Sequence, residues 1–356
     1  MKILHTSDIH IDSPLTSRLS PDKVRQRRRE LLRNFGRLVD AAKDVGAEAI
    51  IIAGDLFDSE KISKKAIDTA LEVIESEKDI GFFYLQGNHE GDALLSSGRA
   101  LPDNLMTFGK DWTYYQLGDI IIAGRNEIRE GMFESLTLPE DSKNIIILHG
   151  ELRDKSASPE SIGLKEAMGK NIDYLALGHY HSYSVEAIDD RGVAVYSGTP
   201  EGRGFDEVGD KGFVIIDTAG TRIKFDFRSF AERRLHIIPI DLTDMVKTAE
   251  ISDAVASAIR NIPYSDMVRV ELVGKYSPAL WKDIDLLSRN FGDRFYYFEV
   301  KDSSRIAINP EDYKYDKSLK GEFIRTVSAD GSLDEETKER IIACGINALM
   351  GEDLFD

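Results

Sequence analysis

Two kinds of hydrophobic pattern alternate along the first part of the chain. Runs rich in Ile, Val and Leu, such as residues 2–7, 49–53 and 144–148, are typical of buried strands, whereas apolar positions spaced by 3.6 residues predict helices. The longest such helix follows Ser20-Pro21, an N-cap residue followed by proline at the first helical position. This alternation predicts a layered α/β fold.

The pattern changes twice further along the chain. Between residues 183 and 227 apolar positions recur every second residue, which predicts paired antiparallel strands. A second module then begins with the order strand, helix, strand, helix, strand, and two more helical stretches follow it. We therefore expect three domains: a main domain at 1–233, a small α/β capping domain at 234–308, and a helical C-terminal appendix at 309–356.

Composition is that of a globular protein. Of 356 residues, 42% are hydrophobic and 31% are charged, which supports a sizeable core and excludes wholesale disorder. No apolar run approaches the roughly 20 residues that span a bilayer, and the N-terminus lacks signal-peptide features. We expect a cytoplasmic protein with no membrane contact. The single cysteine, Cys344, excludes an internal disulfide and a zinc site built from several thiolates.

The charge balance argues against strong DNA binding by the chain alone. It has 46 Lys and Arg against 63 Asp and Glu, a net charge of −17, whereas nucleic-acid binders usually carry a basic excess. A local basic surface is still compatible with this balance. One face of the helix expected at 23–39 could line a DNA-binding surface or be an ordinary solvated helix face. The arginines on this face are Arg25, Arg27, Arg28, Arg29, Arg33 and Arg37.

Short polar clusters follow five of the expected strands. Because the carboxyl ends of strands in an open α/β sheet meet in one crevice, we expect these clusters to converge. Carboxylate, imidazole and amide groups together suit Mn²⁺, Fe²⁺ or Zn²⁺. Each cluster alone is compatible with a simple turn, but five in succession predict a metal site. In chain order they are Asp8-Ile9-His10, Gly54-Asp55-Leu56-Phe57-Asp58, Gly87-Asn88-His89-Glu90, His149-Gly150-Glu151 and Gly178-His179-Tyr180-His181.

At these clusters the sequence resembles the calcineurin-like metallophosphoesterases, whose ordered pattern is D-x-H, G-D-x-x-D, G-N-H-[DE], H and G-H-x-H. The match extends from the N-terminus to about residue 230. It implies a two-sheet metallophosphoesterase sandwich flanked by helices, here followed by the small α/β capping domain and the helical appendix.

Within that superfamily the chain resembles the SbcD-type DNA-repair nucleases at residues 5–10, 54–58 and 196–200. Residues 11–14 and 319–325 are most similar to the YhaO-like branch. The sequence departs from better-known members where Gly follows His149 and where Ser-Tyr-Ser follows His181. These departures leave every metal ligand in place. They bear on two other expectations, DNA as the substrate and the docking of a partner ATPase.

The resemblance implies two divalent metal ions, with Mn²⁺ the expected metal and Fe, Zn or Mg as alternatives. It implies that Asp55 bridges both ions. The remaining ligands would be Asp8, His10 and His181 for one metal, and Asn88, His149 and His179 for the other. Two such cations can stabilise both the attacking and the leaving oxygen of an in-line displacement.

Four further residues near these ligands are candidates for other roles. By the same resemblance His89 is not a ligand but faces the leaving oxygen as a proton donor, with Asp58 or Glu90 orienting it. Imidazole titrates in the range that this role requires. Arg203 follows a Ser-Gly-Thr-Pro turn, and we expect it either to bind a substrate phosphate or to lie in a loop without such a role.

The leading hypothesis is a DNA-repair exonuclease or endonuclease that hydrolyses phosphodiester bonds, acts in repair and recombination, and works with an SMC-like ATPase. One alternative is a phosphoesterase for small molecules or phosphoproteins on the same fold, and another is a non-catalytic adaptor. The acidic appendix at 309–356 would either dock the ATPase or pack on the chain's own body. A homodimer is left open.

Overall fold

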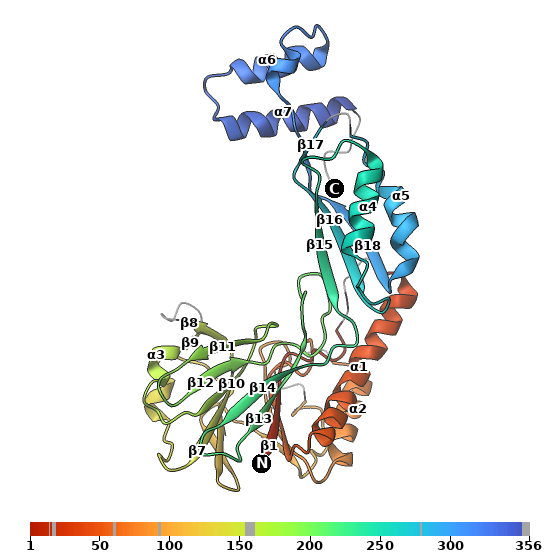
Figure 1. The fold of residues 1–356 in the computed structure, drawn as a ribbon. Helices are drawn as coiled ribbons and strands as arrows, with labels where there is room; N and C mark the ends of the chain where they lie inside the picture. The colour runs from red at the N-terminus through yellow and green to blue at the C-terminus, as the bar shows by residue number, and fades with distance from the viewer. Residues whose placement is uncertain are drawn as a thin grey trace. The chain divides into compact units, whose positions relative to one another are not determined.

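The computed structural model describes residues 1–13, 15, 19–59, 62–91, 94–153, 161–277 and 280–350. The chain divides into two compact units, Met1–Arg234 and Leu235–Asp356, and each is described by itself (Figure 1). The finer division of the second unit into a cap and an appendix stays a prediction. Residues 351–356 of the expected appendix lie outside the described residues.

One six-stranded sheet forms the centre of the first unit. Its strand order is β14-β13-β1-β2-β3-β4; β1 to β4 are parallel, and β13 pairs antiparallel with both neighbours. Every residue of β2 is buried, as expected for a strand covered on both faces. The strands are β1 (Lys2–Thr6), β2 (Ala49–Ala53), β3 (Gly81–Leu85), β4 (Leu105–Thr107), β13 (Gly212–Asp217) and β14 (Lys224–Ser229).

A second six-stranded sheet has the order β11-β12-β10-β7-β6-β5, with parallel strands inside and antiparallel strands at both edges. Antiparallel pairing was expected across residues 183–227, and it is confirmed within β11–β12 and within β13–β14. These two pairs, however, belong to different sheets. The strands are β5 (Thr113–Leu117), β6 (Ile120–Gly124), β7 (Lys143–His149), β10 (Tyr174–Gly178), β11 (Ser184–Ala187) and β12 (Val193–Tyr196).

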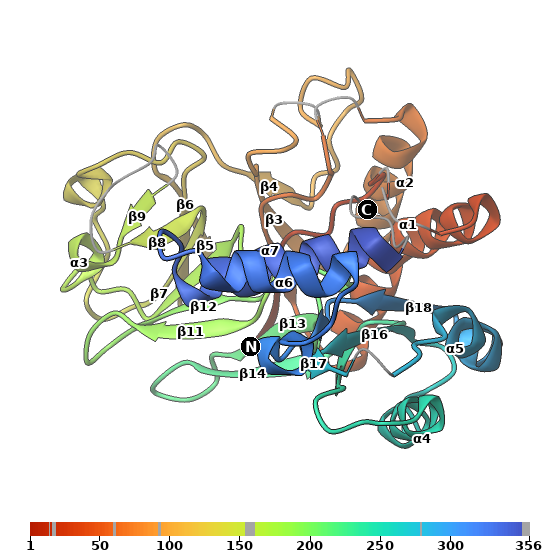
Figure 2. The ribbon, with the colours of Figure 1, turned by 90° about the horizontal axis from the view of Figure 1, so that it is seen from above.

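The two sheets face each other across a shared core. Ile3 and Ile51 of the first sheet pack with Ile122 and Ile145 of the second in one hydrophobic cluster. Helices α1 (Pro21–Asp44) and α2 (Lys64–Ser76) cover the outer face of the first sheet. The 3₁₀ turn η1 (Met132–Ser135), the short ribbon of β8 (Glu151–Arg153) with β9 (Ser161–Gly163), and α3 (Leu164–Ala167) lie on the side of the second sheet. The expected two-sheet sandwich flanked by helices is confirmed, and Figure 2 shows α1 and α2 at one side of it and α3 at the other.

Helix α1 begins as predicted, because the Ser20 hydroxyl accepts a hydrogen bond from the backbone N–H of Lys23. Its polar face differs from the prediction at one position. Arg27 was expected with the exposed arginines, and this is wrong: its side chain is 1% exposed. The guanidinium is buried because it donates to the carboxylates of Glu30 and Glu201, at 2.9 and 3.0 Å.

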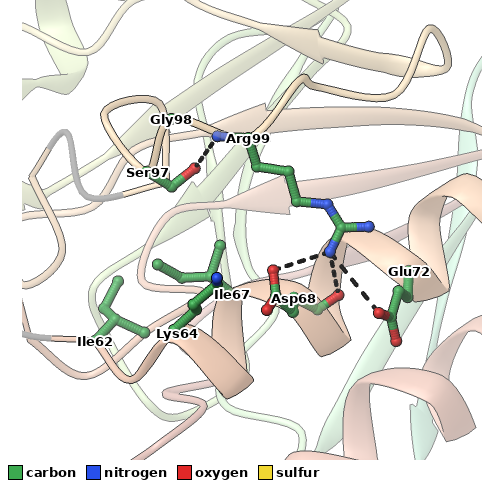
Figure 3. A pocket seen from close by; sticks show the side chains of 8 residues that line it. All are labelled: Ile62, Lys64, Ile67, Asp68, Glu72, Ser97, Gly98 and Arg99. Atoms are coloured by element: carbon green, nitrogen blue, oxygen red, sulfur yellow. Dashed lines mark hydrogen bonds and ion pairs between the residues drawn. The ribbon is translucent and has the colours of Figure 1, made fainter.

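A surface pocket of about 680 Å³ lies beside α2 (Figure 3). Arg99 closes one side of it by donating to the carboxylate of Asp68 at 3.0 Å. Lys64 and Ile67 of α2 also line the pocket, and none of the predicted metal ligands does. This pocket is therefore not the predicted metal site.

The second unit contains a three-stranded parallel sheet in the order β15-β16-β18, and its core also takes up the C-terminal helices. Ile324 of α6 and Ile342 and Ile346 of α7 share one hydrophobic cluster with the strands. In the described part of the chain, no helix combines the length and apolar character of a membrane span. The elements are β15 (Leu235–Asp241), α4 (Thr248–Ala258), β16 (Met267–Val273), β17 (Lys275–Tyr276), α5 (Ile284–Phe291), η2 (Gly292–Arg294), β18 (Tyr297–Asp302), β19 (Arg305–Ile306), η3 (Pro310–Tyr313), α6 (Leu319–Ala329) and α7 (Glu335–Met350).

Candidate metal centre

Strand ends from both sheets bring the predicted ligands together. The segments after β1 and β2 lie side by side, because the backbone N–H of Asp8 donates to Gly54 and that of His10 donates to Asp55, both at 3.0 Å. In the second sheet the end of β7 at His149 pairs in register with the end of β10 at Gly178. Parallel order thus places several polar loops at one edge.

Three groups of side chains among the described residues have the spacing of a metal site. Within each group the potential ligand atoms lie within 4.8 Å of one another. The first group is the same set that the resemblance implies for one metal, apart from the bridging carboxylate. The groups are Asp8, His10 and His181; Asp8, Asp55 and His149; and His10, Asp58 and His89.

The backbone at this site is held in an uncommon conformation. Asp8, His10, Asp55 and His179 all have positive φ, at 51°, 50°, 52° and 103°. Non-glycine residues seldom adopt these angles, and such conformations are stored where the surrounding structure fixes them. Four of the seven predicted ligands therefore depend on backbone angles that the fold imposes.

The first group surrounds a narrow gap between two imidazoles. The Nε2 atoms of His10 and His181 lie 3.2 Å apart, and Nε2 of His181 lies 3.8 Å from a carboxylate oxygen of Asp8. Asp8 is fully buried and accepts hydrogen bonds from the hydroxyl of Ser7 at 2.5 Å and from the backbone N–H of His179. These contacts aim three ligand atoms at one point.

The second group is organised around His149. Its Nδ1 contacts the carbonyl oxygen of Ala53 at 2.9 Å, which leaves Nε2 directed at the amide oxygen of Asn88, 3.0 Å away, and at Asp55, 3.5 Å away. His179 lies beside it, with the ring centroids 5.5 Å apart. Asp55 also lies 3.9 Å from Nε2 of His10, so it is the carboxylate between the two sets.

Glycine is required where the loops cross. A Cβ atom at Gly87 would lie 1.9 Å from a carboxylate oxygen of Asp55, and one at Gly54 would lie 2.2 Å from Nδ1 of His149. Both contacts are far inside van der Waals distance, and Gly54 also has φ +89°. The absence of side chains at these two positions lets the ligand-bearing segments approach each other.

His89 is more exposed than the four buried ligands Asp8, His10, Asp55 and His149, and its neighbour Asn88 is exposed as well. Its side chain is 50% exposed, and Nε2 lies 3.9 Å from Asp55. Asp58 belongs to the same group as His89, whereas Glu90 is fully buried and accepts hydrogen bonds from the backbone N–H groups of Phe57 and Gly87. Of the two carboxylates expected to orient His89, Asp58 is therefore the better placed.

Arg203 reaches the centre but binds carboxylates there. It donates to Asp58 at 2.5 Å and to Glu207 at 2.8 Å, and Glu207 in turn contacts Nδ1 of His181 at 2.7 Å. Glu207 was not among the residues predicted from the sequence, because a lone glutamate in a loop carries no spacing signal. Ser197, whose hydroxyl contacts that of Ser7 at 2.9 Å, was not predicted as a site residue either, although it lies in the 196–200 stretch that carries the resemblance.

The electrostatics of the centre favour a cation. Burial alone would raise the pKa of Asp55, but the hydrogen bond with His149 and the neighbouring imidazoles lower it to about 2. Burial would lower the pKa of His149, but the contact with Asp55 raises it to about 9. Burial, together with the charge of Asp55, raises the pKa of Glu90 to about 7. Asp55 is thus held as an anion at the middle of the cluster.

Known proteins with similar sequences include an archaeal repair protein and a bacterial phosphoesterase. The DNA double-strand break repair protein Mre11 of Sulfurisphaera tokodaii is 28% identical over 62% of this chain and 60% of its own length. The uncharacterized metallophosphoesterase YhaO of Bacillus subtilis is 24% identical over 68% of this chain and 64% of its own length. The chain thus spans less than two thirds of the length of these relatives.

The chain also aligns with a solved phosphatase structure and matches a family model. Purple acid phosphatase from yellow lupin (Lupinus luteus) seeds aligns with 64% of this chain and 51% of its own, with a TM-score of 0.41 and 13% identity. The model of the calcineurin-like phosphoesterase family matches residues 1–209, which cover both sheets' central strands and all five polar clusters. The chain therefore belongs to the calcineurin-like phosphoesterase family.

Proposed function

We propose that the protein is a two-metal-dependent phosphodiesterase that cleaves DNA, as a repair exonuclease or endonuclease. The observation that carries the proposal is the position of Asp55 between two sets of ligand atoms, one at His10 and one at His149. Similarity to a protein named for DNA double-strand break repair supports DNA as the substrate class.

The proposed ligand sets follow the geometry. Asp8, His10 and His181 would hold one cation, and Asn88, His149 and His179 the other, with Asp55 shared by both. Bound divalent ions, with Mn²⁺ as the proposed metal, would supply charge for the phosphate oxygens and a nucleophile at neutral pH. The mixture of carboxylate, imidazole and amide donors fits such ions.

His89 is the proposed proton donor for the leaving oxygen. Its imidazole is half exposed, so it is accessible to a substrate. A carboxylate oxygen of Asp55 lies 3.9 Å from its Nε2, and one of Asp58 lies within 4.8 Å of a ring nitrogen. Glu90 would support this step only indirectly, by holding the backbone of Gly87 through its hydrogen bond. The proposal thus assigns proton transfer to His89 and metal binding to the other ligands, although the ligand atoms of His10, Asp58 and His89 also lie within 4.8 Å of one another.

A basic surface on α1 offers a place for the DNA backbone. Arg25, Arg28, Arg29 and Arg33 are exposed on the N-terminal half of the helix. That half begins after the end of β1, and a helix that follows a parallel strand begins on the side where the strand ends, which supports a location toward the ligand loops. In a chain of net charge −17, this arginine face supplies the positive charge that phosphate binding needs.

An SMC-like ATPase is the proposed partner, as the SbcD-type resemblance implies. Leu319 of α6 and Ile341 and Leu349 of α7 are exposed apolar side chains, at 69%, 36% and 47%. The same two helices bury Ile324 and Ile346 in the second unit's own core. We therefore propose that the helices serve both roles, with one face packed internally and one face available to the partner.

The test uses the purified chain with Mn²⁺, Mg²⁺, Zn²⁺ or Fe²⁺ and three substrates: labelled linear DNA, a chromogenic phosphodiester and a chromogenic phosphomonoester. We expect cleavage of DNA and of the diester, with the Asp55→Asn variant as the inactive control. Cleavage of the monoester or the diester without DNA would favour the small-molecule or phosphoprotein alternative. No hydrolysis of any substrate by protein with two bound metals would favour an adaptor.

A further inference from the structure

Two imidazoles of the metal centre each have a carboxylate beside the ring nitrogen Nδ1: His181 shares a hydrogen bond with Glu207, whereas His10 lies at ion-pair distance from Asp58 without hydrogen-bond geometry. Nδ1 of His10 lies 3.0 Å from Asp58, and Nδ1 of His181 lies 2.7 Å from Glu207. The opposite ring nitrogens, the two Nε2 atoms, face each other at 3.2 Å. The two rings are thus oriented so that both Nε2 atoms point into the same small space.

One guanidinium joins the two carboxylates. Arg203 donates from Nη1 to Asp58 at 2.5 Å, and from Nη2 and Nε to one oxygen of Glu207 at 2.8 and 3.2 Å. Its backbone N–H donates to the other oxygen of Glu207 at 2.7 Å. The side chains of Arg203, Asp58 and Glu207 are only 18%, 16% and 5% exposed.

These contacts leave Arg203 poorly placed for a substrate phosphate. Three of its N–H directions end on carboxylate oxygens, and a phosphate would have to displace two charged partners from a mostly buried site. The planar fork of arginine, in contrast, suits a fixed bridge between two carboxylates. The geometry favours a role in organising the site over a role in gripping the substrate.

We propose that Arg203 is a positioning residue, which through Asp58 and Glu207 fixes His10 and His181 in the orientation that one shared metal ion requires. The proposal rests on the proposed metal site. An Nδ1–H that His181 donates to Glu207 would leave the lone pair of Nε2 free for a cation, and Asp58 would attract the ring of His10 by its charge. Loss of such a supporting contact typically weakens metal binding by about 10–100-fold.

The other ligand set provides an internal comparison. Nδ1 of His149 contacts the backbone carbonyl oxygen of Ala53 at 2.9 Å. This ring nitrogen thus does not depend on the carboxylates that Arg203 joins. Its orientation is therefore set by β2 itself. If Arg203 acts as proposed, its loss should affect the affinity of the His10–His181 site and spare the site at His149.

The experiment is a calorimetric titration of the full chain with Mn²⁺, in the absence of substrate. Arg203→Ala and Glu207→Gln should each weaken one of two sites by about 10–100-fold and leave the other unchanged. Arg203→Lys should lie between these variants and the wild type, since an ammonium carries the charge but lacks the fork. Arg228→Ala is the matched control, because Arg228 forms an exposed pair with Asp226 and should bind both ions as the wild type does.

Thermal unfolding in chelator identifies variants that have lost their fold. If Arg203→Ala does not fold, Glu207→Gln and Arg203→Lys decide the matter. Unchanged affinity at both sites in folded variants, an equal loss at both sites, or a wild type that binds no Mn²⁺ would each overturn the positioning role. A wild type that binds two Mn²⁺ ions but cleaves no DNA would instead overturn the proposed function, with the titration still deciding the role of Arg203.

Discussion

The Nε2 atoms of His10 and His181 lie 3.2 Å apart, although 171 positions separate the two residues in the chain. His10 follows β1 in one sheet and His181 follows β10 in the other. Only the packing of the two sheets against each other brings these rings together. The candidate metal centre is therefore a product of the sandwich and not of either sheet alone.

Asp55 should matter more for metal binding than any other carboxylate of the centre. We expect Asp55→Asn to lose both metals and all hydrolytic activity, because a neutral amide cannot offset two dications. Asp8→Asn should mainly weaken one site. Metal content of the purified variants, measured by mass spectrometry of the metals, checks this. Two ions per chain in Asp55→Asn would rule out the bridging role.

His89 should contribute to turnover and not to metal retention. We expect His89→Ser to keep both metals and to reduce kcat by about 10²–10⁴-fold, the usual scale for a lost general acid. The loss should shrink for diesters whose leaving group is more acidic, since these need less protonation. A fall in metal content parallel to the fall in kcat would mean that His89 is a ligand.

The exposed arginines of α1 should set the affinity for DNA. Replacing Arg25, Arg29 and Arg33 together by alanine should weaken binding of duplex DNA and lower the salt dependence by about 0.9 in log–log slope for each lost phosphate contact. The matched control replaces three other exposed cations, Lys64, Lys65 and Lys78, by alanine, so that the same amount of charge is removed. DNA affinity is measured by fluorescence anisotropy. An equal loss of affinity in both triple variants would mean that net charge, and not the arginine face of α1, determines DNA binding.

The two faces of the C-terminal helices should respond differently to substitution. Ile346→Ala should destabilise the second unit by about 2–5 kcal/mol, because Ile346 is fully buried in its core. Leu319→Asp and Leu349→Asp should leave the unfolding temperature unchanged and abolish co-purification with an SMC-like ATPase. Co-purification that survives both exposed substitutions would place the partner elsewhere.

The buried Glu30 should make folding sensitive to acid. Burial raises the pKa of this carboxyl, but hydrogen bonds from Arg233 and Arg27 outweigh it and lower the pKa below its usual value. Such a group stabilises the fold above the unfolded pKa of about 4.3, and this contribution is lost as pH falls through the lower folded pKa.

Glu30→Gln should therefore be less stable than the wild type at pH 7 and lose less stability on acidification below about pH 4. Glu140→Gln, at an exposed glutamate of the same unit, is the control and should follow the wild-type curve. Urea unfolding at several pH values provides the measurement. Parallel curves for Glu30→Gln and the wild type would show that Glu30 does not carry the acid dependence.

Strand and helix positions in the first unit follow from local pattern. The apolar runs that end at Ala53 and Leu148 are strong signals for strands buried on both faces, and the capped helix that starts at Pro21 has the 3.6-residue period of a helix buried on one face. Pairing was harder to predict. The strands between residues 183 and 227 look alike in sequence, yet β11–β12 and β13–β14 belong to different sheets, which only long-range packing decides.

For the site, the sequence by itself determined five polar clusters at strand ends, which predict a metal site because such strand ends meet in one crevice. The family resemblance then implied the individual ligands. Tertiary structure alone decided which groups support them. Arg27 became buried because Glu30 and Glu201 surround it, and Glu207 entered the centre because Arg203 and His181 both reach it. Ligands come with a spacing that the backbone sets locally, whereas a supporting ion pair depends on where distant loops meet.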